Sequence, residues 1–414
     1  MGSEFLKTRD ISQVDTILKD LFEKLYVEPK FDKVSLDHAL FRVLSDDIYA
    51  SINLPPFDRT LRDGFAVKVQ DTFNATEENP VTLNLLEVIG AGDVPQKEIK
   101  TGYCSEISTG APIPKGANGV VMIEFSEKEG DKVHLFKTSY PGQFIALKGS
   151  DIEKGDLVLK KGTILSPEKI GVLSALGFSK IKVDKKMKVA IISTGNELLS
   201  AEKQLEYGKI YDVNSLALHA ALKTYGTNPV IKGIVPDEYE VLKNTIKNSL
   251  NDFDLIITSG GTSAGAGDVL RLVLDDLGKV MVHGITMKPG KPTIIGEIDH
   301  KLIVGLPGNP SAALIVLDVL LAPHLKSYSG LTDKASSKIN LPLSTRFHSA
   351  RGRIQYVLIK VVDNKVHPIL KDSGAINALV EADGYITIPK NVELIAEGTN
   401  VDVILFDDFS INLS

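Results

Sequence analysis

The sequence predicts a multidomain protein with a central parallel α/β domain, further β domains and a helical, extended region. Its 414 residues are too many for one hydrophobic core, and at about 150 residues per domain they correspond to about three domains. Hydrophobic residues make up 43% and charged residues 24%, as in ordinary folded proteins. The spacing of apolar residues changes along the chain, so different regions are expected to fold differently.

The N-terminal stretch from Leu6 to about Ala50 is predicted to be mainly helical. Its apolar residues recur at helical spacing until Pro29 ends the pattern; they are Val14, Ile17, Leu18, Leu21, Phe22 and Leu25. Residues 149–186 contain a short strand pattern and a helix over Pro167–Leu176. We expect this helix to pack with the first one, so that residues 1–46 and 146–186 form one helical and extended domain.

Residues 47–145 are predicted to be a β domain inserted between these two segments. Short alternating runs such as Val81–Val88 and Gly119–Ile123 are separated by Gly, Pro and Asn, which is typical of strands and turns. After Gly330, runs such as Ile354–Val361 and Tyr385–Ile388 predict a C-terminal β barrel over residues 332–414. The inserted domain raises the expected number of domains to four.

Strands and helices alternate over residues 187–331, which predicts a parallel sheet with helices on both faces. The expected strands are Val189–Ser193, Pro229–Val235, Leu255–Thr258 and Leu302–Leu306, and the expected helices are Leu216–Tyr225, Glu238–Leu250, Val269–Leu277 and Ala312–Tyr328. Ligands of such sheets bind where the carboxyl ends of the strands meet, so we expect the functional residues in the loops that follow these strands.

Charge and composition exclude several classes of protein. The net charge is −6 and no basic block is present, which argues against nucleic acid and membrane surfaces as partners. The longest apolar stretch, Ala312–Ala322, is interrupted by Asp318 and is shorter than the roughly 18 residues of a membrane span. Cys104 is the only cysteine and the chain starts without a signal-peptide pattern, so a cytoplasmic location is expected.

Three of the expected loops carry a carboxylate, namely Glu197, Asp237 and Asp268. Carboxylates that converge near a phosphate or another oxyanion require a divalent cation between them, and their hard oxygen ligands favour magnesium. The alternative is that Asp237 and Asp268 are helix N-caps. Their common position after strands favours a functional role for the set.

The loop from Ser259 to Asp268 is rich in glycine and precedes a helix, so its N–H groups can surround an anion such as a phosphate. No Gly-Lys-Ser/Thr follows, as a Walker A loop would require, and the third glycine of a dinucleotide fingerprint is missing. The alternative is a tight turn without a ligand. Lys288 and Lys291, in a proline-stiffened segment before the fourth strand, are either counter-charges for such an anion or solvent-exposed surface residues.

The segment Pro55–Phe65 combines two prolines, two carboxylates and two arginines. A segment this dense and stiff is seldom a mere spacer, which favours a functional role. The alternative is that Asp58, Arg59 and Arg62 form a local network of surface ion pairs, which contributes little energy. The spacing alone leaves both interpretations open.

Taken together, these motifs resemble the molybdopterin molybdenumtransferase family, which comprises MoeA and the related domain of gephyrin. The resemblance covers the whole chain. It is carried by Pro55-Pro56-Phe57-Asp58, Asp63-Gly64, Thr109-Gly110-Ala111-Pro112, Gly149-Ser150-Asp151-Ile152, Thr194-Gly195-Asn196-Glu197-Leu198, Asp212-Val213-Asn214, Ser259 to Asp268, Met287-Lys288-Pro289-Gly290-Lys291-Pro292 and Leu306-Pro307-Gly308-Asn309-Pro310.

The resemblance implies a homodimer of four-domain subunits with a molybdopterin-binding α/β domain, and an active site between the two subunits. The implied reaction takes adenylylated molybdopterin and molybdate, inserts the metal into the dithiolene and releases AMP, with Mg²⁺ as cofactor. The enzyme that adenylylates molybdopterin is a further implied partner. Two other assignments compete with this one. The protein could be the molybdopterin adenylyltransferase itself, or a non-enzymatic, gephyrin-like scaffold.

Family positions linked to activity match a defined set of residues here. They are Asp63, Thr109, Asp151, Glu197, Asp237, Asp268, Lys288, Pro307 and Pro310. We assign catalysis to Asp63, Glu197, Asp237 and Asp268, and metal binding to the last three. Substrate binding is assigned to Thr109, Asp151, Thr194, Gly195, Ser259, Gly260, Gly261, Ser263, Lys288, Lys291, Pro307 and Pro310. Asp63 would act from the partner subunit.

The sequence departs from the family pattern at a few positions. Thr60-Leu61-Arg62 replaces a common Ser-Ala-Met, Phe65 replaces a common Tyr, and Gly284 stands where some members have a lysine. Ala264 to Gly267 lacks a charged pair often found before the Asp. These changes affect the expected phosphate contacts and leave tungstate open as an alternative to molybdate.

Overall fold

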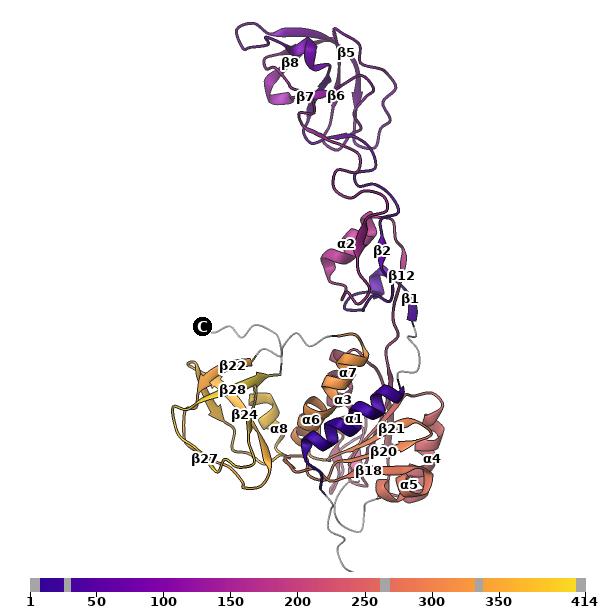
Figure 1. The fold of residues 1–414 in the computed structure, drawn as a ribbon, viewed down its shortest axis with the longest axis vertical. Coiled ribbons are helices and arrows are strands. Elements are labelled where there is room, and N and C mark those ends of the chain that lie inside the picture. The colour runs from indigo at the N-terminus through magenta and orange to yellow at the C-terminus, as the bar shows by residue number, and fades with distance from the viewer. Residues whose placement is uncertain (1–7, 26–30, 261–268, 332–337, 407–414) are drawn as a thin grey trace, which may run out of the picture. The chain divides into compact units, whose positions relative to one another are not determined.

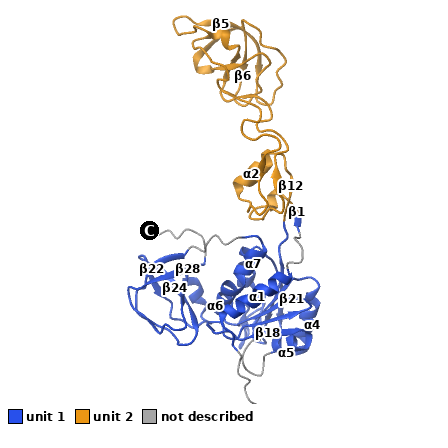
Figure 2. Ribbon diagram, viewed as in Figure 1, with its two compact units in different colours: residues 1–32, 184–414 blue, residues 33–183 orange. Residues whose placement is uncertain are grey.

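The computed structural model describes residues 8–25, 31–260, 269–331 and 338–406 (Figure 1). Contacts within the chain define two compact units. One comprises residues 1–32 and 184–414, and the other comprises residues 33–183 (Figure 2). The boundaries of the four expected domains stay a prediction.

The first unit is built on a mixed sheet whose strand order, within the described ranges, is β16-β13-β17-β21-β20-β18. Its parallel strands are β16 (Asn228–Val235), β13 (Lys188–Thr194), β17 (Leu255–Ser259) and β21 (Lys301–Leu306), which are the strands that the sequence predicts. Two antiparallel strands, β20 (Ile294–Ile298) and β18 (Lys279–His283), extend the sheet beyond β21. The sequence pattern does not predict these two short strands, because the prolines and glycines between them interrupt it.

Helices cover both faces of this sheet. On one face, α1 (Ile11–Leu25), α3 (Asn214–Thr224) and α6 (Pro310–Val316) enclose a core with Ile191 and Ile257. On the other face, α4 (Tyr239–Leu250) and α5 (Val269–Leu277) enclose a core with Ile192 and Ile256. Successive strand residues thus point to opposite faces, which explains why these strands are apolar throughout.

The first helix packs on the α/β core, which differs from the sequence expectation. Its buried residues Val14, Leu18, Leu21 and Phe22 belong to the same cluster as Val282 and Leu320. The helix α2 (Pro167–Ala175), its expected neighbour, contributes Leu173 and Ile170 to a separate cluster. Within the described residues, the predicted helical stretch is an α-helix over Ile11–Leu25, and Phe31–Ser35 forms the strand β1. Periodicity identifies an apolar stripe but not the surface that the stripe covers.

A continuous helical segment follows β21. It consists of α6, a π-helical turn at Leu317–Leu321 and α7 (Ala322–Tyr328). Among the described residues, Pro310–Tyr328 is the segment long and apolar enough to span a membrane by length and composition, with a mean hydropathy of 1.2. Its buried residues, including Val316, Leu321 and Leu325, lie inside the α/β core. We therefore interpret it as a core helix.

The C-terminal part of this unit is a β domain around a separate apolar cluster. Its described strands are β22 (Lys338–Pro342), β23 (Phe347–His348), β24 (Ile354–Val362), β25 (Lys365–Pro368), β26 (Gly384–Ile388), β27 (Leu394–Ile395) and β28 (Asn400–Leu405), with the short helix α8 (Ile376–Glu381). The short strand β19 (Met287–Lys288) of the α/β region pairs with β24. Asp318 of the π-helical turn also accepts hydrogen bonds of 2.8 Å from the hydroxyls of Tyr225 and Tyr385.

The second unit contains a β domain whose described strands follow the order β7-β4-β6-β5-β9-β8. These strands are β7 (Gly119–Met122), β4 (Gly64–Val67), β6 (Tyr103–Ile107), β5 (Val81–Ile89), β9 (Lys132–Leu135) and β8 (Ser126–Glu129). Cys104 lies in its core, and burial raises the pKa of its thiol to about 12, so this thiol is not a nucleophile at neutral pH.

The rest of the second unit surrounds a small core with α2. The paired strands are β1 with β12 (Lys180–Asp184), β2 (Ile48–Tyr49) with β11 (Leu157–Leu159), and β3 (Arg59–Thr60) with β10 (Ile145–Ala146). The pairing of β3 with β10 brings the beginning and the end of the inserted β domain together.

Candidate active site

The carboxyl ends of the parallel strands lie side by side, as expected for this sheet. Ser259 of β17 is in register with Ser193 of β13 and with Leu306 of β21, while Thr194 is in register with Val235 of β16. The residues at and after these ends form one edge, which we call the strand edge. Its described members are Thr194–Glu197, Pro236–Asp237, Ser259–Gly260 and Pro307–Pro310.

Two of the predicted carboxylates interact at the strand edge. A Cβ placed on Gly195 would lie 2.8 Å from the Glu197 carboxylate, so this exposed side chain folds back over the end of β13. Burial raises the pKa of the Asp237 carboxyl; the nearby Thr194 hydroxyl opposes this increase, and the negative charge of Glu197 adds to it. An adjacent uncompensated pair of carboxylates is a suitable site for a cation.

Asp237 is not a helix cap. The helix α4 begins at Tyr239, and Glu238 occupies the N-cap position without a side-chain capping bond. The backbone N–H of Asp237 donates to Asn196 Oδ1 at 3.4 Å, which joins the ends of β13 and β16. The capping alternative is therefore wrong for Asp237. Asp268, together with Gly261 and Ser263, lies outside the described residues.

Several buried polar atoms near the strand edge have no hydrogen-bond partner in the described part of the chain. They are Thr194 Oγ1, Asn214 Oδ1, Asp237 Oδ1 and Thr258 Oγ1. Leaving a buried polar atom unpaired costs about 1–3 kcal/mol, and native proteins contain few such atoms. Thr194 and Asp237 lie close enough for the hydroxyl to act on the carboxyl group, and all four atoms lie at or near the carboxyl ends of the strands.

The glycine after β17 permits a close backbone approach at this edge. Gly260 has a φ of +97°, and a Cβ on it would lie 2.2 Å from the carbonyl oxygen of Thr194. Its N–H donates to Leu306 O at 3.2 Å. Gly260 thus holds the ends of β13, β17 and β21 close together, and a side chain at this position would separate them.

The segment that carries the two candidate lysines, Lys288 and Lys291, leads into β20 at the same edge of the sheet. The strand β20 runs antiparallel to β21, and its first residue, Ile294, is paired with Gly305. The segment just before β20 therefore leaves the sheet where β21 ends. Lys288 is exposed and Lys291 is half-buried. This topology links the proline-rich segment to the strand edge, a link that the sequence did not provide.

Asn214 belongs to the Asp212-Val213-Asn214 motif but is not among the predicted site residues. Its Nδ2 donates to Ser259 Oγ and to Gly308 O, each at 2.7 Å. Both acceptors belong to the strand edge. The signal that could have identified Asn214 is the Asp-Val-Asn run placed just before a helix that packs on the first strand.

The candidate residues of the β domain belong to the second unit. Asp63 Oδ1 accepts the backbone N–H of Thr109 at 2.7 Å, which brings these two predicted residues together. Asp58 Oδ1 accepts the N–H of Lys148 at 2.7 Å. Asp58 is therefore a loop acceptor, and no ion pair between it and Arg59 or Arg62 is found within the residues that the structure describes. Asp63, Thr109 and Asp151 are all exposed.

The described residues contain no cluster of three or more His, Cys, Asp or Glu side chains suited to a metal ion. Of the predicted magnesium ligands, Glu197 and Asp237 are within these residues. Their proximity and the unpaired Asp237 Oδ1 fit a hard divalent cation, because carboxylate oxygens are the ligands that magnesium prefers.

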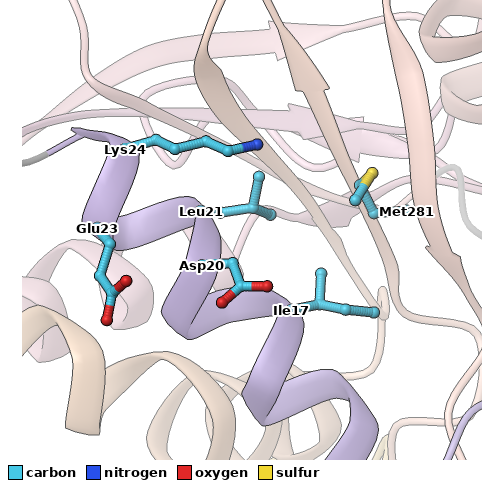
Figure 3. Close-up of a pocket in the computed structure, with 6 residues that line it drawn as sticks. All are labelled: Ile17, Asp20, Leu21, Glu23, Lys24 and Met281. Carbon is cyan, nitrogen blue, oxygen red and sulfur yellow. The ribbon is translucent and has the colours of Figure 1, made fainter.

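A surface depression of about 450 Å³ lies between α1 and β18 (Figure 3). It is lined by Ile17, Asp20, Leu21, Glu23, Lys24 and Met281. None of the predicted site residues lines it. Unpaired polar atoms, and not the depth of the surface, therefore identify the candidate site.

An α/β domain with this strand edge, an inserted β domain before it and a small β domain after it defines a molybdopterin-biosynthesis type of architecture. Family models match in the same order. The MoeA N-terminal region (domain I and II) matches residues 12–177, the probable molybdopterin binding domain matches residues 190–327, and the MoeA C-terminal region (domain IV) matches residues 340–406.

Individual proteins agree with these models. A molybdopterin biosynthesis protein of Methanocaldococcus jannaschii is 38% identical over 400 residues, covering 94% of this chain and 96% of that protein. Molybdopterin molybdenumtransferase 2 of Mycobacterium tuberculosis is 34% identical over 383 residues, covering 89% and 94%. A crystal structure of the Pyrococcus horikoshii MoeA protein has a TM-score of 0.82 and 37% identity, covering 97% of this chain and 100% of that one. The chain belongs to the MoeA family of molybdopterin molybdenumtransferases.

Proposed function

We propose that this protein completes the molybdenum cofactor: it takes adenylylated molybdopterin and molybdate, inserts the metal and releases AMP. Its family membership supports the reaction class. The observation that carries the proposal to a site is the group of unpaired buried polar atoms beside two adjacent carboxylates at the strand edge. A polyanionic substrate with many hydrogen-bond donors and acceptors suits such an edge.

The strand edge would bind and orient the substrate. Thr194 and Asp237 offer oxygen atoms that lack partners, and Gly260 keeps the strand ends close enough for one ligand to contact several of them. Lys288 and Lys291 would offset the charge of the phosphates. Positioning a reactive phosphoanhydride in this way lowers the barrier because the entropy of orientation is lost on binding.

Glu197 and Asp237, with Asp268, would hold Mg²⁺. When bound, this ion would neutralise charge on the phosphoanhydride as its phosphorus–oxygen bond breaks and AMP departs. The role of the protein is to keep the two carboxylates adjacent and to orient the leaving phosphate toward the lysines. Molybdate is the metal substrate in this proposal, and tungstate is the competing oxyanion.

The proposal includes a cytoplasmic homodimer in which Asp63, Thr109 and Asp151 act on the substrate from the partner subunit. The support is their exposure and their match to family positions. Asp63 and Thr109 lie in adjoining loops, so they can form one contact surface. Sedimentation equilibrium measures the dimer, and mixing an Asp63→Ala subunit with a Glu197→Ala subunit tests complementation between subunits.

Release of AMP tests the function directly. The purified protein is incubated with adenylylated molybdopterin and Mg²⁺, with and without molybdate, and AMP is measured by chromatography. We expect AMP only when both molybdate and Mg²⁺ are present. A parallel incubation with ATP and molybdopterin measures pyrophosphate. Pyrophosphate production without molybdate-dependent AMP release would identify an adenylyltransferase and contradict the proposal.

A further inference from the structure

The first turn of α3 is fixed to the sheet by hydrogen bonds from several side chains. Asp212, just before the helix, accepts the N–H of Ser215 at 3.1 Å, and the Ser215 hydroxyl also donates to the Asp212 carboxylate. Ser193 Oγ of β13 is 2.7 Å from Ser215 Oγ. This turn is therefore a rigid support beneath the strand edge.

Asn214, in the same turn, joins two strands that Ser215 does not contact. Its amide nitrogen donates to the hydroxyl of Ser259 at the end of β17 and to the carbonyl of Gly308 after β21, at 2.7 Å each. Asn214 is 9% exposed and Ser259 is 2% exposed, so the hydrogen bond between them is shielded from solvent, where it is stronger and more directional than at the surface. The bond to Gly308 is only partly buried, because Gly308 is exposed.

The oxygen atom of the Asn214 amide group is in an unfavourable environment. Its Oδ1 is buried without a partner, which is unfavourable by about 1–3 kcal/mol relative to a paired acceptor. An apolar side chain of similar shape would avoid this cost. An asparagine at this position is therefore explained by what its nitrogen does, which is to set the spacing of Ser259 and Gly308.

We infer that Asn214 is a positioning residue for the substrate: it fixes the described start of the loop after β17, Ser259–Gly260, relative to Gly308 in the loop after β21. This inference rests on the proposed function, because residues of both loops are assigned to substrate binding. Gly260, one residue beyond Ser259, already brings the backbones of β13, β17 and β21 together. Asn214 adds a side-chain brace on the α3 face of the sheet.

The substitution Asn214→Ala removes the brace, and Ser193→Ala is the matched control. The control deletes one buried hydrogen bond of 2.7 Å from the same helical turn to the sheet, but it leaves both loops untouched. We expect kcat/KM for AMP release to fall by about tenfold to hundredfold in Asn214→Ala, because small displacements of bound substrate cost rate steeply. Ser193→Ala should lose less than about threefold, with a comparable fall in thermal stability.

A double-mutant cycle identifies the path of the effect. Ser259→Ala removes one acceptor of the brace together with its own substrate contact, so the loss in Asn214→Ala/Ser259→Ala should be smaller than the sum of the two single losses. Additive losses in kcat/KM would show that Asn214 does not act through Ser259 and would overturn the inference.

Amide hydrogen exchange tests the brace without any reaction. Exchange in peptides that contain Ser259 or Gly308 should accelerate in Asn214→Ala and stay as in the wild type in Ser193→Ala. Equal exchange in the two variants overturns the inference, even if both release AMP. If the wild-type protein releases no AMP, the proposed function fails, while the exchange measurement still decides whether Asn214 holds the two loops.

Discussion

The strand edge of the α/β domain and the Asp63 loop of the β domain both carry candidate carboxylates, but these carboxylates have different partners. Asp63 and Asp58 are exposed and accept backbone N–H groups of neighbouring loops. Asp237 is partly buried, has an unpaired oxygen and lies beside the charge of Glu197. The first region is satisfied by its own chain, whereas the second keeps an unpaired buried oxygen, which a cation or ligand would satisfy in the proposed function.

This difference has a general lesson for locating function. A carboxylate with satisfied hydrogen bonds can serve the fold alone, so its position in a motif does not prove that it acts in chemistry. Unpaired buried oxygen atoms have an energetic cost that the fold does not explain. The strand edge is therefore the stronger candidate for binding, and the Asp63 loop is the region where structural and chemical roles must be separated by experiment.

The largest expected effect is at Glu197. In Glu197→Ala, the pair with Asp237 is lost, and we expect AMP release to fall by about 100-fold or more because the cation site loses a ligand. Magnesium titrations of AMP release measure the change. The matched control is Glu238→Gln, which changes the exposed carboxylate that follows Asp237 in the sequence and makes no capping bond. If Glu197→Ala kept the magnesium dependence of the wild type, Glu197 would not be a cation ligand, and the strand edge would not differ from the Asp63 loop in this respect.

Glycine substitutions compare the two regions sterically. Gly260→Ala places a Cβ 2.2 Å from the Thr194 carbonyl oxygen, whereas Gly110→Ala, at a φ of +86° next to Thr109, meets no atom within 4 Å. Each replacement incurs about 1–2 kcal/mol for a left-handed backbone. Gly260→Ala adds a collision between backbone segments, so it should lose more stability, as measured by urea unfolding. Equal losses would mean that the strand edge is less tightly packed than we describe.

Substitutions of Asp63 separate its two roles. Asp63→Asn retains an oxygen that accepts the N–H of Thr109, whereas Asp63→Ala removes the acceptor and should cost about 1 kcal/mol of stability. If the carboxylate acts in chemistry, both variants lose AMP release. Circular dichroism melting gives the stability, and the AMP assay gives the activity. Full activity in Asp63→Asn would restrict Asp63 to a structural role.

The smallest expected effect is a pH-dependent gain of stability in Asp237→Asn. Because the folded state raises the pKa of Asp237, its ionised form is disfavoured, and the wild type loses stability as pH rises from the unfolded-state pKa through the raised one. The variant cannot ionise at this position, so its melting temperature should exceed that of the wild type at pH 7 and match it in acid. Saturating Mg²⁺ should reduce the difference. An unchanged difference across this pH range would contradict the raised pKa.

Much of the α/β domain follows from local sequence. The parallel strands are apolar on both faces, so their pattern is unambiguous, and their order along the chain places the loops at one edge. The strands β18 and β20 were missed because the prolines and glycines between them interrupt the strand pattern. The packing of α1 was also missed, because an amphipathic pattern does not identify which core receives Leu18 and Leu21.

The candidate site was predictable by residue type but not by contact. Glu197 and Asp237 were identified from their positions after strands, and their mutual influence requires the register between β13 and β16. Asn214 escaped selection because its importance lies in two contacts with residues 45 and 94 positions away. Such contacts depend on the tertiary fold, and local patterns contain no information about them.

The carboxylate of Asp318 influences how the first unit unfolds, because it is hydrogen-bonded to two domains. It accepts the hydroxyl of Tyr225 from the end of α3 and that of Tyr385 from the C-terminal β domain. Burial, followed by this nearby charge, raises the pKa of both tyrosines, so both remain hydroxyl donors throughout the neutral range. If the C-terminal β domain detached alone, the Asp318 carboxylate would lose one of its two hydrogen-bond donors. Tyr385 would at the same time lose its apolar contact with the α/β core. One shared acceptor in a π-helical turn therefore couples the two domains, which favours a single cooperative melting transition for them.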